Sequence, residues 1–284
     1  MSNPDSANTI RFDGQVALVT GAGRGLGAAY ARLLASRGAS VVVHDAGVSR
    51  EGDGFDPSVA DAVVEQIVAD GGKAAASHEN LEDASACARV VQFAAERFGR
   101  LDVLIHNAGL VVFSELQEMD AALWSRMINL GVHAPYHLLR AAIPLMRQQR
   151  YGRIVLTTSG RALRVSDCVP GLVGYSVGKM AQLGLMVGVA AENQAHGVHI
   201  NAISPVAATR VLRRSAPELL PELVAPGVGF LASSACNESG IVLLAAGGRF
   251  QAATWIDEQG VDFGKTPVDP EAIAASWADI CGRP

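Results

Sequence analysis

Short runs of apolar residues recur along the chain, and the longer stretches between them repeat apolar residues at helical spacing. Most of the short runs are continuous rather than alternating, which is typical of strands buried on both faces of a parallel sheet. Seven of them predict strands, over residues 15–20, 39–45, 73–78, 101–107, 152–159, 198–204 and 241–246. The helical stretches cover residues 26–37, 58–70, 83–98, 121–149 and 175–196.

Regular alternation of strand and helix predicts an α/β fold, because parallel strands are joined by crossover helices. Crossovers of one hand then distribute the helices over both sides of the sheet. Glycines close several helices, among them Gly38 and Gly99, and glycine is the usual residue at a helix end. We therefore predict one doubly wound, Rossmann-type domain, with a seven-stranded parallel sheet and helices on both faces.

The pattern changes after Gly247 and Gly248. Residues 1–248 form the predicted dinucleotide-binding catalytic domain, and residues 249–284 a C-terminal extension of the same domain. The extension contains one predicted helix over residues 269–281, with Pro270 suited to its first turn. A length of 284 residues, 49% hydrophobic residues and a mean hydropathy of +0.23 allow a large core.

Composition excludes several classes of function. A formal net charge of −5 argues against nucleic acid or an anionic membrane as partner. No apolar run approaches the ~18 residues of a membrane span, and the N-terminus lacks a secretory pattern, so we predict a cytoplasmic protein. Four scattered cysteines and seven histidines offer no metal-ligand spacing, so no metal is expected.

A glycine-rich turn, TGAGRGLG, occupies residues 20–27 between the first predicted strand and the first predicted helix. Glycines at such a junction let backbone N–H groups approach a pyrophosphate. Asp45 closes the second strand, where a carboxylate accepts hydrogen bonds from a ribose diol and repels a 2′-phosphate. Arg24 inside the turn is a weak argument for NADP, because an arginine can pair with the 2′-phosphate. We therefore predict NAD as the cofactor, in preference to NADP.

Tyr175 and Lys179 lie four residues apart in the segment YSVGK, on one face of a predicted helix. A neighbouring ammonium is expected to lower the pKa of the phenol, which would suit it to acid/base catalysis between an alcohol and a ketone. Ser159, sixteen residues earlier, is the candidate partner for the substrate oxygen. Thr157 and Thr158 directly precede it and remain alternatives.

These residues resemble the short-chain dehydrogenase/reductase family over about residues 14–248. The glycine turn matches T-G-x-x-x-G-x-G, and HNAG matches the family's N-N-A-G except at His106, which we interpret as structural. Val206 replaces a glycine, and the gap between serine and tyrosine is about three residues longer than usual. Stretches such as VVVHDAG are closest in appearance to the (3R)-hydroxyacyl-CoA dehydrogenase part of peroxisomal multifunctional enzymes.

The resemblance implies a site and an assembly. Its catalytic residues are Asn129, Ser159, Tyr175 and Lys179, with Asn129 holding a water that links Lys179 to solvent. Its cofactor-binding residues are Gly21, Arg24, Gly25, Leu26, Gly27, Asp45, Asn80, Leu81, Asn107, Ala108, Gly109, Tyr175, Lys179, Pro205, Val206 and Thr209. It also implies a homo-oligomer, either a tetramer or a dimer.

The expected substrate pocket is largely apolar, with Val111, Phe113, Leu163, Val165 and Leu212 in its wall. We therefore predict an NAD-dependent ketoreductase acting on a bulky secondary alcohol or ketone, such as a steroid, terpenoid or aryl compound. Arg210, Arg213 and Arg214 leave two alternatives: they bind the phosphates of a 3-hydroxyacyl-CoA, or they are solvated helix charges. A catalytically inactive NAD-binding regulatory protein is the alternative from another class.

Overall fold

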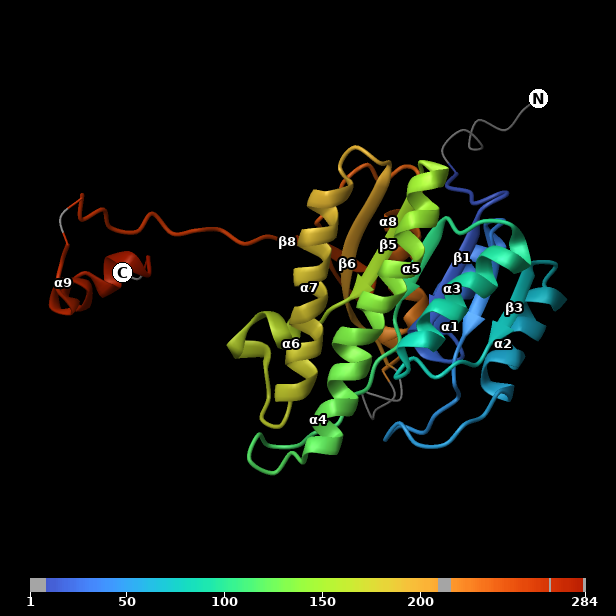
Figure 1. Ribbon diagram of the computed structural model, residues 1–284, viewed down its shortest axis with the longest axis horizontal. Helices are drawn as coiled ribbons and strands as arrows, with labels where there is room; N and C mark the ends of the chain where they lie inside the picture. The colour runs from blue at the N-terminus through green and yellow to red at the C-terminus, as the bar shows by residue number, and fades with distance from the viewer. Residues whose placement is uncertain (1–8, 209–215, 266, 283–284) are drawn as a thin grey trace. The chain divides into compact units, whose positions relative to one another are not determined.

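The computed structural model describes residues 9–208, 216–265 and 267–282. Contacts between Cα atoms divide the chain into two compact units, one that ends at Ala252 and one that begins at Ala253. The first unit is an α/β layer structure in which helices cover both faces of a twisted sheet (Figure 1). The predicted fold class is confirmed.

The sheet has eight strands in the order β3-β2-β1-β4-β5-β6-β7-β8. The strands are β1 (Val16–Thr20), β2 (Ser40–His44), β3 (Lys73–Ser77), β4 (Val103–His106), β5 (Gly152–Thr157), β6 (Val198–Val206), β7 (Val242–Ala246) and β8 (Arg249–Ala253). All pairings from β3 across to β7 are parallel. The order reverses between β1 and β4, which is where doubly wound sheets bind their ligands.

The eighth strand corrects the predicted seven. Gly247 and Gly248 both have positive φ, 53° and 79°, and form the two-residue connection between β7 and β8. So short a connection joins antiparallel neighbours. The sequence pattern missed β8 because most of its side chains are exposed, so the strand lacks the continuous apolar run of a buried one.

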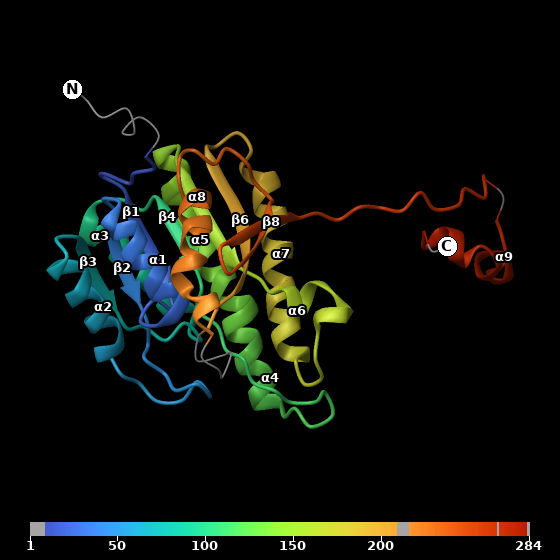
Figure 2. The same cartoon turned by 180° about the vertical axis from the view of Figure 1, so that it is seen from behind.

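Helices on the two faces form separate layers (Figures 1 and 2). One layer holds α1 (Gly25–Ser36), α2 (Ser58–Ala69) and α8 (Ala225–Leu231), and the other α3 (Ala84–Phe98), α4 (Ala121–Ile128), α5 (Ala134–Gln149) and α7 (Val173–Asn193). Short elements complete the chain: α6 (Gly160–Leu163), η3 (Val165–Asp167), η4 (Pro217–Leu219), η5 (Pro221–Leu223), α9 (Pro270–Ala275) and α10 (Trp277–Ile280). Among the described residues, no helix combines the length and apolarity needed to cross a membrane.

The long helix predicted over residues 121–149 is interrupted by one π-helical turn, η2 (Asn129–His133). Gly131 in this turn packs directly against Gly178 of α7, since a Cβ on Gly131 would lie 2.8 Å from the Cα of Gly178. Two glycines therefore bring the helices close together. This contact fixes the height of α7, and with it Tyr175 and Lys179, relative to the end of the sheet.

Candidate active site

A cavity of about 1520 Å³ lies at the carboxyl ends of the central strands. Its lining includes most of the predicted site residues: Gly21, Arg24, Gly25, Leu26, Asp45, Asn80, Leu81, Asn107, Ala108, Gly109, Val111, Phe113, Ser159, Tyr175, Lys179, Pro205 and Val206. The volume exceeds the 300–1,000 Å³ of a typical site for one small ligand. The cavity therefore has room for a cofactor and a substrate together.

Four predicted residues are not part of this lining. Gly27 is buried behind the glycine turn, and Asn129 begins the π-helical turn whose next residue, Leu130, does reach the cavity. Leu163 lies on α6 outside the lining, and Val165 is 95% exposed. Thr209 and Leu212, together with Arg210, Arg213 and Arg214, lie outside the described residues.

The glycine turn is shaped by steric necessity. Gly21 and Gly25 have φ values of 61° and 53°, a region that residues with a Cβ rarely occupy. A Cβ on Gly27 would collide with the carbonyl oxygen of Gly21, which also accepts a hydrogen bond from Asn107 Nδ2 at 2.9 Å. The N-cap residue, Arg24, makes no side-chain hydrogen bond to the first turn of α1. The backbone N–H groups in the first turn of α1 can therefore bind an anion such as a pyrophosphate.

Asp45 is held rigidly at the end of β2. Its Oδ2 accepts a hydrogen bond from Gly23 N at 2.9 Å, and its Oδ1 accepts one from Gly47 N at 2.8 Å. Each carboxylate oxygen keeps a further lone pair, so a diol can still bind. A fixed negative charge at this edge favours a ribose hydroxyl and disfavours a phosphate.

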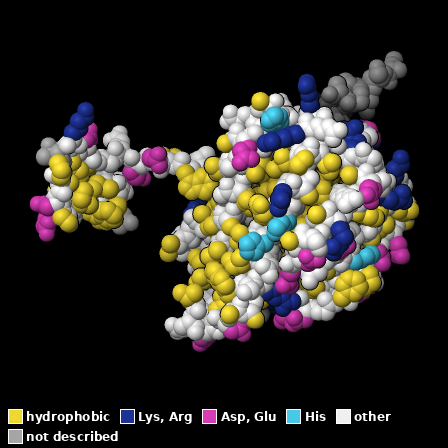
Figure 3. All heavy atoms as spheres, viewed as in Figure 1, with side chains coloured by type: hydrophobic (Ala, Val, Ile, Leu, Met, Phe, Trp, Pro, Cys, Tyr) yellow, Lys and Arg dark blue, Asp and Glu magenta, His cyan; other side chains and the backbone are white. Residues whose placement is uncertain are grey.

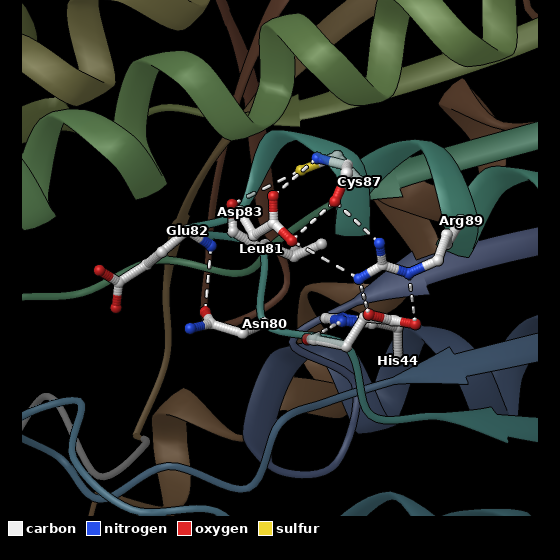
Figure 4. Close-up of polar contacts among 9 residues, drawn as sticks. His44, Asn80, Leu81, Glu82, Asp83, Cys87 and Arg89 are labelled. Carbon is white, nitrogen blue, oxygen red and sulfur yellow. Dashed lines mark hydrogen bonds and ion pairs between the residues drawn. The ribbon is translucent and has the colours of Figure 1, made fainter.

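A polar network behind the β3 loop supports this end of the cavity (Figure 4). The Arg89 guanidinium pairs with Glu79 at 2.7 Å, and His44 Nε2 lies 2.9 Å from the Glu79 carbonyl oxygen. Asn80 Oδ1 accepts a hydrogen bond from Glu82 N, which closes the turn that presents Asn80 to the cavity. Sequence reasoning missed His44 and Arg89, since neither belongs to a motif.

Lys179 is buried and its ammonium is fixed. Nζ donates a hydrogen bond to the Thr157 carbonyl oxygen at 2.8 Å and lies 5.7 Å from the centre of the Tyr175 ring. Thr157 Oγ1 donates to the carbonyl of His106, and Thr158 Oγ1 donates to the carbonyl of Lys179. Both threonine hydroxyls are therefore committed to backbone oxygens. Ser159, whose Oγ accepts a hydrogen bond from Arg161 N at 3.3 Å, is the better candidate to bind a substrate oxygen.

The pKa values of the pair depart from the sequence expectation. Burial raises the pKa of Tyr175, although a hydrogen bond with Ser159 and the charge of Arg161 act in the opposite direction. Burial also lowers the pKa of Lys179 to about 8. We expected Lys179 to lower the Tyr175 pKa, but the groups that oppose the upward shift are Ser159 and Arg161. At neutral pH the Tyr175 phenol therefore keeps its proton, and Lys179 is also mainly protonated.

His106 holds the ends of β1 and β4 together. Thr20 Oγ1 accepts hydrogen bonds from the backbone N–H groups of Asn107 and Ala108, so its own proton is free for His106 Nδ1, 3.0 Å away. Burial, with the nearby charge of Lys179, lowers the pKa of His106 to about 3. The imidazole is neutral and buried, in keeping with a structural role. No group of three or more potential metal ligands occurs within residues 9–208, 216–265 and 267–282.

Comparison with known proteins shows the family of the chain. The short chain dehydrogenase family model matches residues 15–218. A short-chain type dehydrogenase/reductase of Mycobacterium tuberculosis is 35% identical over 271 residues, covering 94% of this chain and 93% of its own. The crystal structure of a short chain dehydrogenase from Mycobacterium avium superposes with a TM-score of 0.83 at 33% identity and covers 96% of both chains.

Longer peroxisomal proteins are also similar. Peroxisomal multifunctional enzyme type 2 of Mus musculus is 37% identical over 285 residues, covering 97% of this chain but 38% of its own. The hydratase-dehydrogenase-epimerase of Neurospora crassa is 35% identical over 281 residues, covering 96% of this chain and 31% of its own. This chain thus spans about a third of these two relatives.

Solved structures with bound cofactor do not decide between the two nucleotides. A metagenomic short-chain oxidoreductase in complex with NADP matches at 34% identity and a TM-score of 0.67, covering 78% of this chain and 91% of its own. Carveol dehydrogenase from Mycobacterium avium in complex with NAD, at 24% identity and a TM-score of 0.73, shares the fold over 83% of this chain and 97% of its own. From its family match, its relatives and its superposition, the chain belongs to the short-chain dehydrogenase/reductase family of oxidoreductases.

Proposed function

We propose that the chain is an NAD(H)-dependent dehydrogenase that interconverts the alcohol and ketone of a 3-hydroxyacyl thioester, such as a 3-hydroxyacyl-CoA. The observation that carries the reaction type is the convergence of Ser159, Tyr175 and Lys179 on one cavity with the glycine turn. The thioester is supported by the similarity to peroxisomal multifunctional and hydratase-dehydrogenase-epimerase proteins. This support favours the acyl-CoA alternative over the steroid, terpenoid or aryl substrate that we predicted first.

The cavity fits a dinucleotide. Gly21 and Gly25, both with positive φ, line the cavity at the start of α1, where a pyrophosphate would bind, and the Asp45 carboxylate is placed for the adenosine ribose. Gly109 lies beside the Lys179 ammonium, since a Cβ on Gly109 would be 3.5 Å from Nζ, and both residues line the cavity where a second ribose would bind. When bound, the nicotinamide supplies the hydride acceptor or donor.

The chain's own residues manage the proton. In ketone reduction, the Tyr175 phenol donates its proton to the substrate oxygen as the oxygen gains the electron pair of the carbonyl bond. Ser159 Oγ donates a hydrogen bond to the same oxygen and stabilises its developing charge. In alcohol oxidation the phenolate takes that proton back. Ser159 and the charge of Arg161 stabilise the phenolate, and Lys179, positively charged below about pH 8, lies beside the Tyr175 ring.

Asn129 remains part of the proposal as the link between Lys179 and solvent. It stands at the first position of the π-helical turn that packs on α7. Single π-turns inside α-helices are frequent at functional sites. The turn brings the Asn129 backbone to the helix that carries Lys179, which is what a water-linked proton route requires.

The substrate assignment is tested by NADH absorbance with two alcohols, a 3-hydroxyacyl-CoA and a hydroxysteroid. A higher kcat/KM with the thioester supports the proposal. A higher kcat/KM with the hydroxysteroid would return the assignment to the bulky apolar class, which the exposed Phe113 and the buried Leu172 in the cavity wall favour.

A regulatory protein without catalysis is the alternative from another class. It predicts tight NAD binding and no turnover over a broad panel of carbonyl compounds. The presence of Ser159, Tyr175 and Lys179 in one cavity argues against it. We also propose a cytoplasmic location, which a fractionation of the source cells would test.

A homo-oligomer is the last part of the proposal. Apolar side chains are exposed on the face of α5 and α7 that Figure 3 presents. They include Tyr136, Val177, Met180 and Val187, of which Val187 is 60% exposed. Apolar surface of this kind is typical of a protein interface. Size-exclusion chromatography with light scattering distinguishes a dimer or tetramer from a monomer.

A further inference from the structure

Arg161 is a charged side chain in the cavity that no family motif explains. It lies two residues after Ser159, in the segment 160–174 that is longer than the family pattern. Its side chain is exposed and belongs to the lining of the cavity that also contains Tyr175. Within the described residues, its guanidinium makes no ion pair and no hydrogen bond to a side chain.

The neighbouring charges of the same segment do not compensate Arg161. Arg164 Nη1 pairs with Asp167 Oδ2 at 3.0 Å, so these two residues neutralise each other. Asp167 also borders the cavity, but its carboxylate is already matched. Arg161 therefore leaves a net positive charge beside the reacting groups. A guanidinium binds oxygen acceptors such as carbonyls and carboxylates through several parallel N–H groups.

The position of Arg161 indicates which substrate oxygen it would reach. The oxygen that reacts must lie within hydrogen-bond distance of both Ser159 Oγ and the Tyr175 phenol. Arg161 lies two residues after Ser159, in the single turn of α6, and its charge acts on the Tyr175 hydroxyl. Its partner is therefore an acceptor on the same substrate, near the reacting carbon, because Arg161, Ser159 and Tyr175 line one cavity.

We propose that Arg161 is a substrate-binding residue that recognises an acceptor oxygen two carbons from the reacting carbon, as in the C1 carbonyl of a 3-hydroxyacyl or 3-oxoacyl group. This inference rests on the proposed function and extends it, because it assigns the recognition of the acyl group to one residue. A thioester carbonyl and a free carboxylate both place an acceptor oxygen on C1. The test therefore separates them.

The experiment compares the full-length protein with Arg161→Met and Arg161→Lys. Methionine removes the charge but keeps an unbranched chain, and lysine keeps the charge without the planar fork. Arg140→Met is the control, because Arg140 is an exposed arginine on α5 outside the lining of the cavity. Each protein is assayed with a 3-hydroxyacyl-CoA, with the free 3-hydroxy acid, and with a secondary alcohol that lacks the C1 oxygen.

With the thioester, Arg161→Met is expected to lose roughly 10- to 100-fold in kcat/KM, the value of a charge-assisted hydrogen bond. With the alcohol that lacks C1 oxygen, the loss stays below about 3-fold. Arg161→Lys loses less than Arg161→Met with the thioester, and Arg140→Met stays within about 3-fold on all substrates. A larger loss with the free acid than with the thioester identifies a carboxylate as the partner.

Two outcomes overturn the inference in distinguishable ways. Equal losses on all three substrates in Arg161→Met mean that Arg161 recognises no second oxygen, while the proposed function stands. If the unmodified protein turns over the plain alcohol but not the thioester or the free acid, the proposed function fails and the inference fails with it.

Discussion

The two halves of the cavity are built by different means. In the nucleotide half, positive φ at Gly21 and Gly25 and the steric contact at Gly27 restrict the sequence to glycine, and the Asp45 carboxylate is tied to the backbone by two hydrogen bonds. In the substrate half, Arg161 and Phe113 are exposed side chains on connecting segments. Backbone geometry thus restricts the residue types in the first half, whereas exposed side chains line the second.

The largest effect is expected at the boundary between the halves. Tyr175→Phe removes the proton donor and acceptor and is expected to lower kcat by roughly 10²- to 10⁴-fold. NADH affinity, measured by fluorescence titration, should change less than about 3-fold, because the hydroxyl is not part of the nucleotide half. Near-normal turnover in this variant would show that Tyr175 is not the acid/base residue at this boundary.

The nucleotide half is tested next through Asp45. Asp45→Ala removes the acceptor for the ribose diol and the charge that disfavours a 2′-phosphate. We expect kcat/KM with NAD to fall roughly 10- to 100-fold and the ratio of NAD to NADP activity to move toward one. Equal activity with both cofactors in the unmodified protein would contradict this assignment.

Lys179, at the boundary between the halves, makes the free energy of unfolding depend on pH. Its pKa is about 8 in the folded protein and about 10.4 in an unfolded chain, so between these values the unfolded state binds more protons. Lys179 therefore contributes a rise of about 1 kcal/mol per pH unit to the free energy of unfolding from about pH 8 toward 10, and above about pH 9 Cys87, whose thiol pKa burial raises to about 12, contributes in the opposite direction. Above pH 10 the raised pKa of Tyr175 acts in the opposite direction.

Urea unfolding at several pH values, without added nucleotide, measures this slope. Lys179→Met carries no titrating group at this position and is the matched control. A slope that is the same in both proteins would mean that Lys179 is not held in a desolvated, fixed position.

The smallest effect concerns the loop that borders the nucleotide half, residues 47–57. Arg126 at the end of α4 binds it through Asp53 Oδ1 at 2.9 Å and the Gly52 carbonyl, and also pairs with Glu82 at 3.1 Å. Arg126→Met is expected to weaken NAD binding roughly 3- to 10-fold by loosening this loop. Arg140→Met, an exposed arginine on α5, is the control, and equal affinity in both variants would show that the loop needs no such support.

The sequence predicts the nucleotide half of the cavity better than the substrate half. Gly27 and Asp45 could be predicted from residue type, because steric limits in the glycine turn and a carboxylate at a strand end each follow from the sequence pattern; the structure shows the close contact at Gly27 and two backbone hydrogen bonds at Asp45. The strand β8 was missed because its side chains are exposed, and Val165 was assigned to the pocket although it is 95% exposed. The Tyr175 pKa was predicted in the wrong direction, because burial depends on packing that spacing along a helix does not encode.

Arg161 shows what sequence alone does not predict about the substrate half. Its value as a candidate depends on the ion pair between Arg164 and Asp167, which leaves it as the uncompensated charge of the segment. Nothing in the order of residues says which of the two arginines pairs with the aspartate. Only the folded segment separates a solvated charge from one that borders the cavity.

The central claim is that a tyrosine-dependent centre shared with the family acts here on a 3-hydroxyacyl thioester. It is tested most directly by NADH formation from a 3-hydroxyacyl-CoA, with the unmodified protein and Tyr175→Phe measured side by side against a hydroxysteroid. The account predicts a kcat/KM for the thioester at least roughly 10-fold above that for the steroid, and loss of both activities in Tyr175→Phe. Preference for the steroid, or thioester oxidation that survives in Tyr175→Phe, would contradict it.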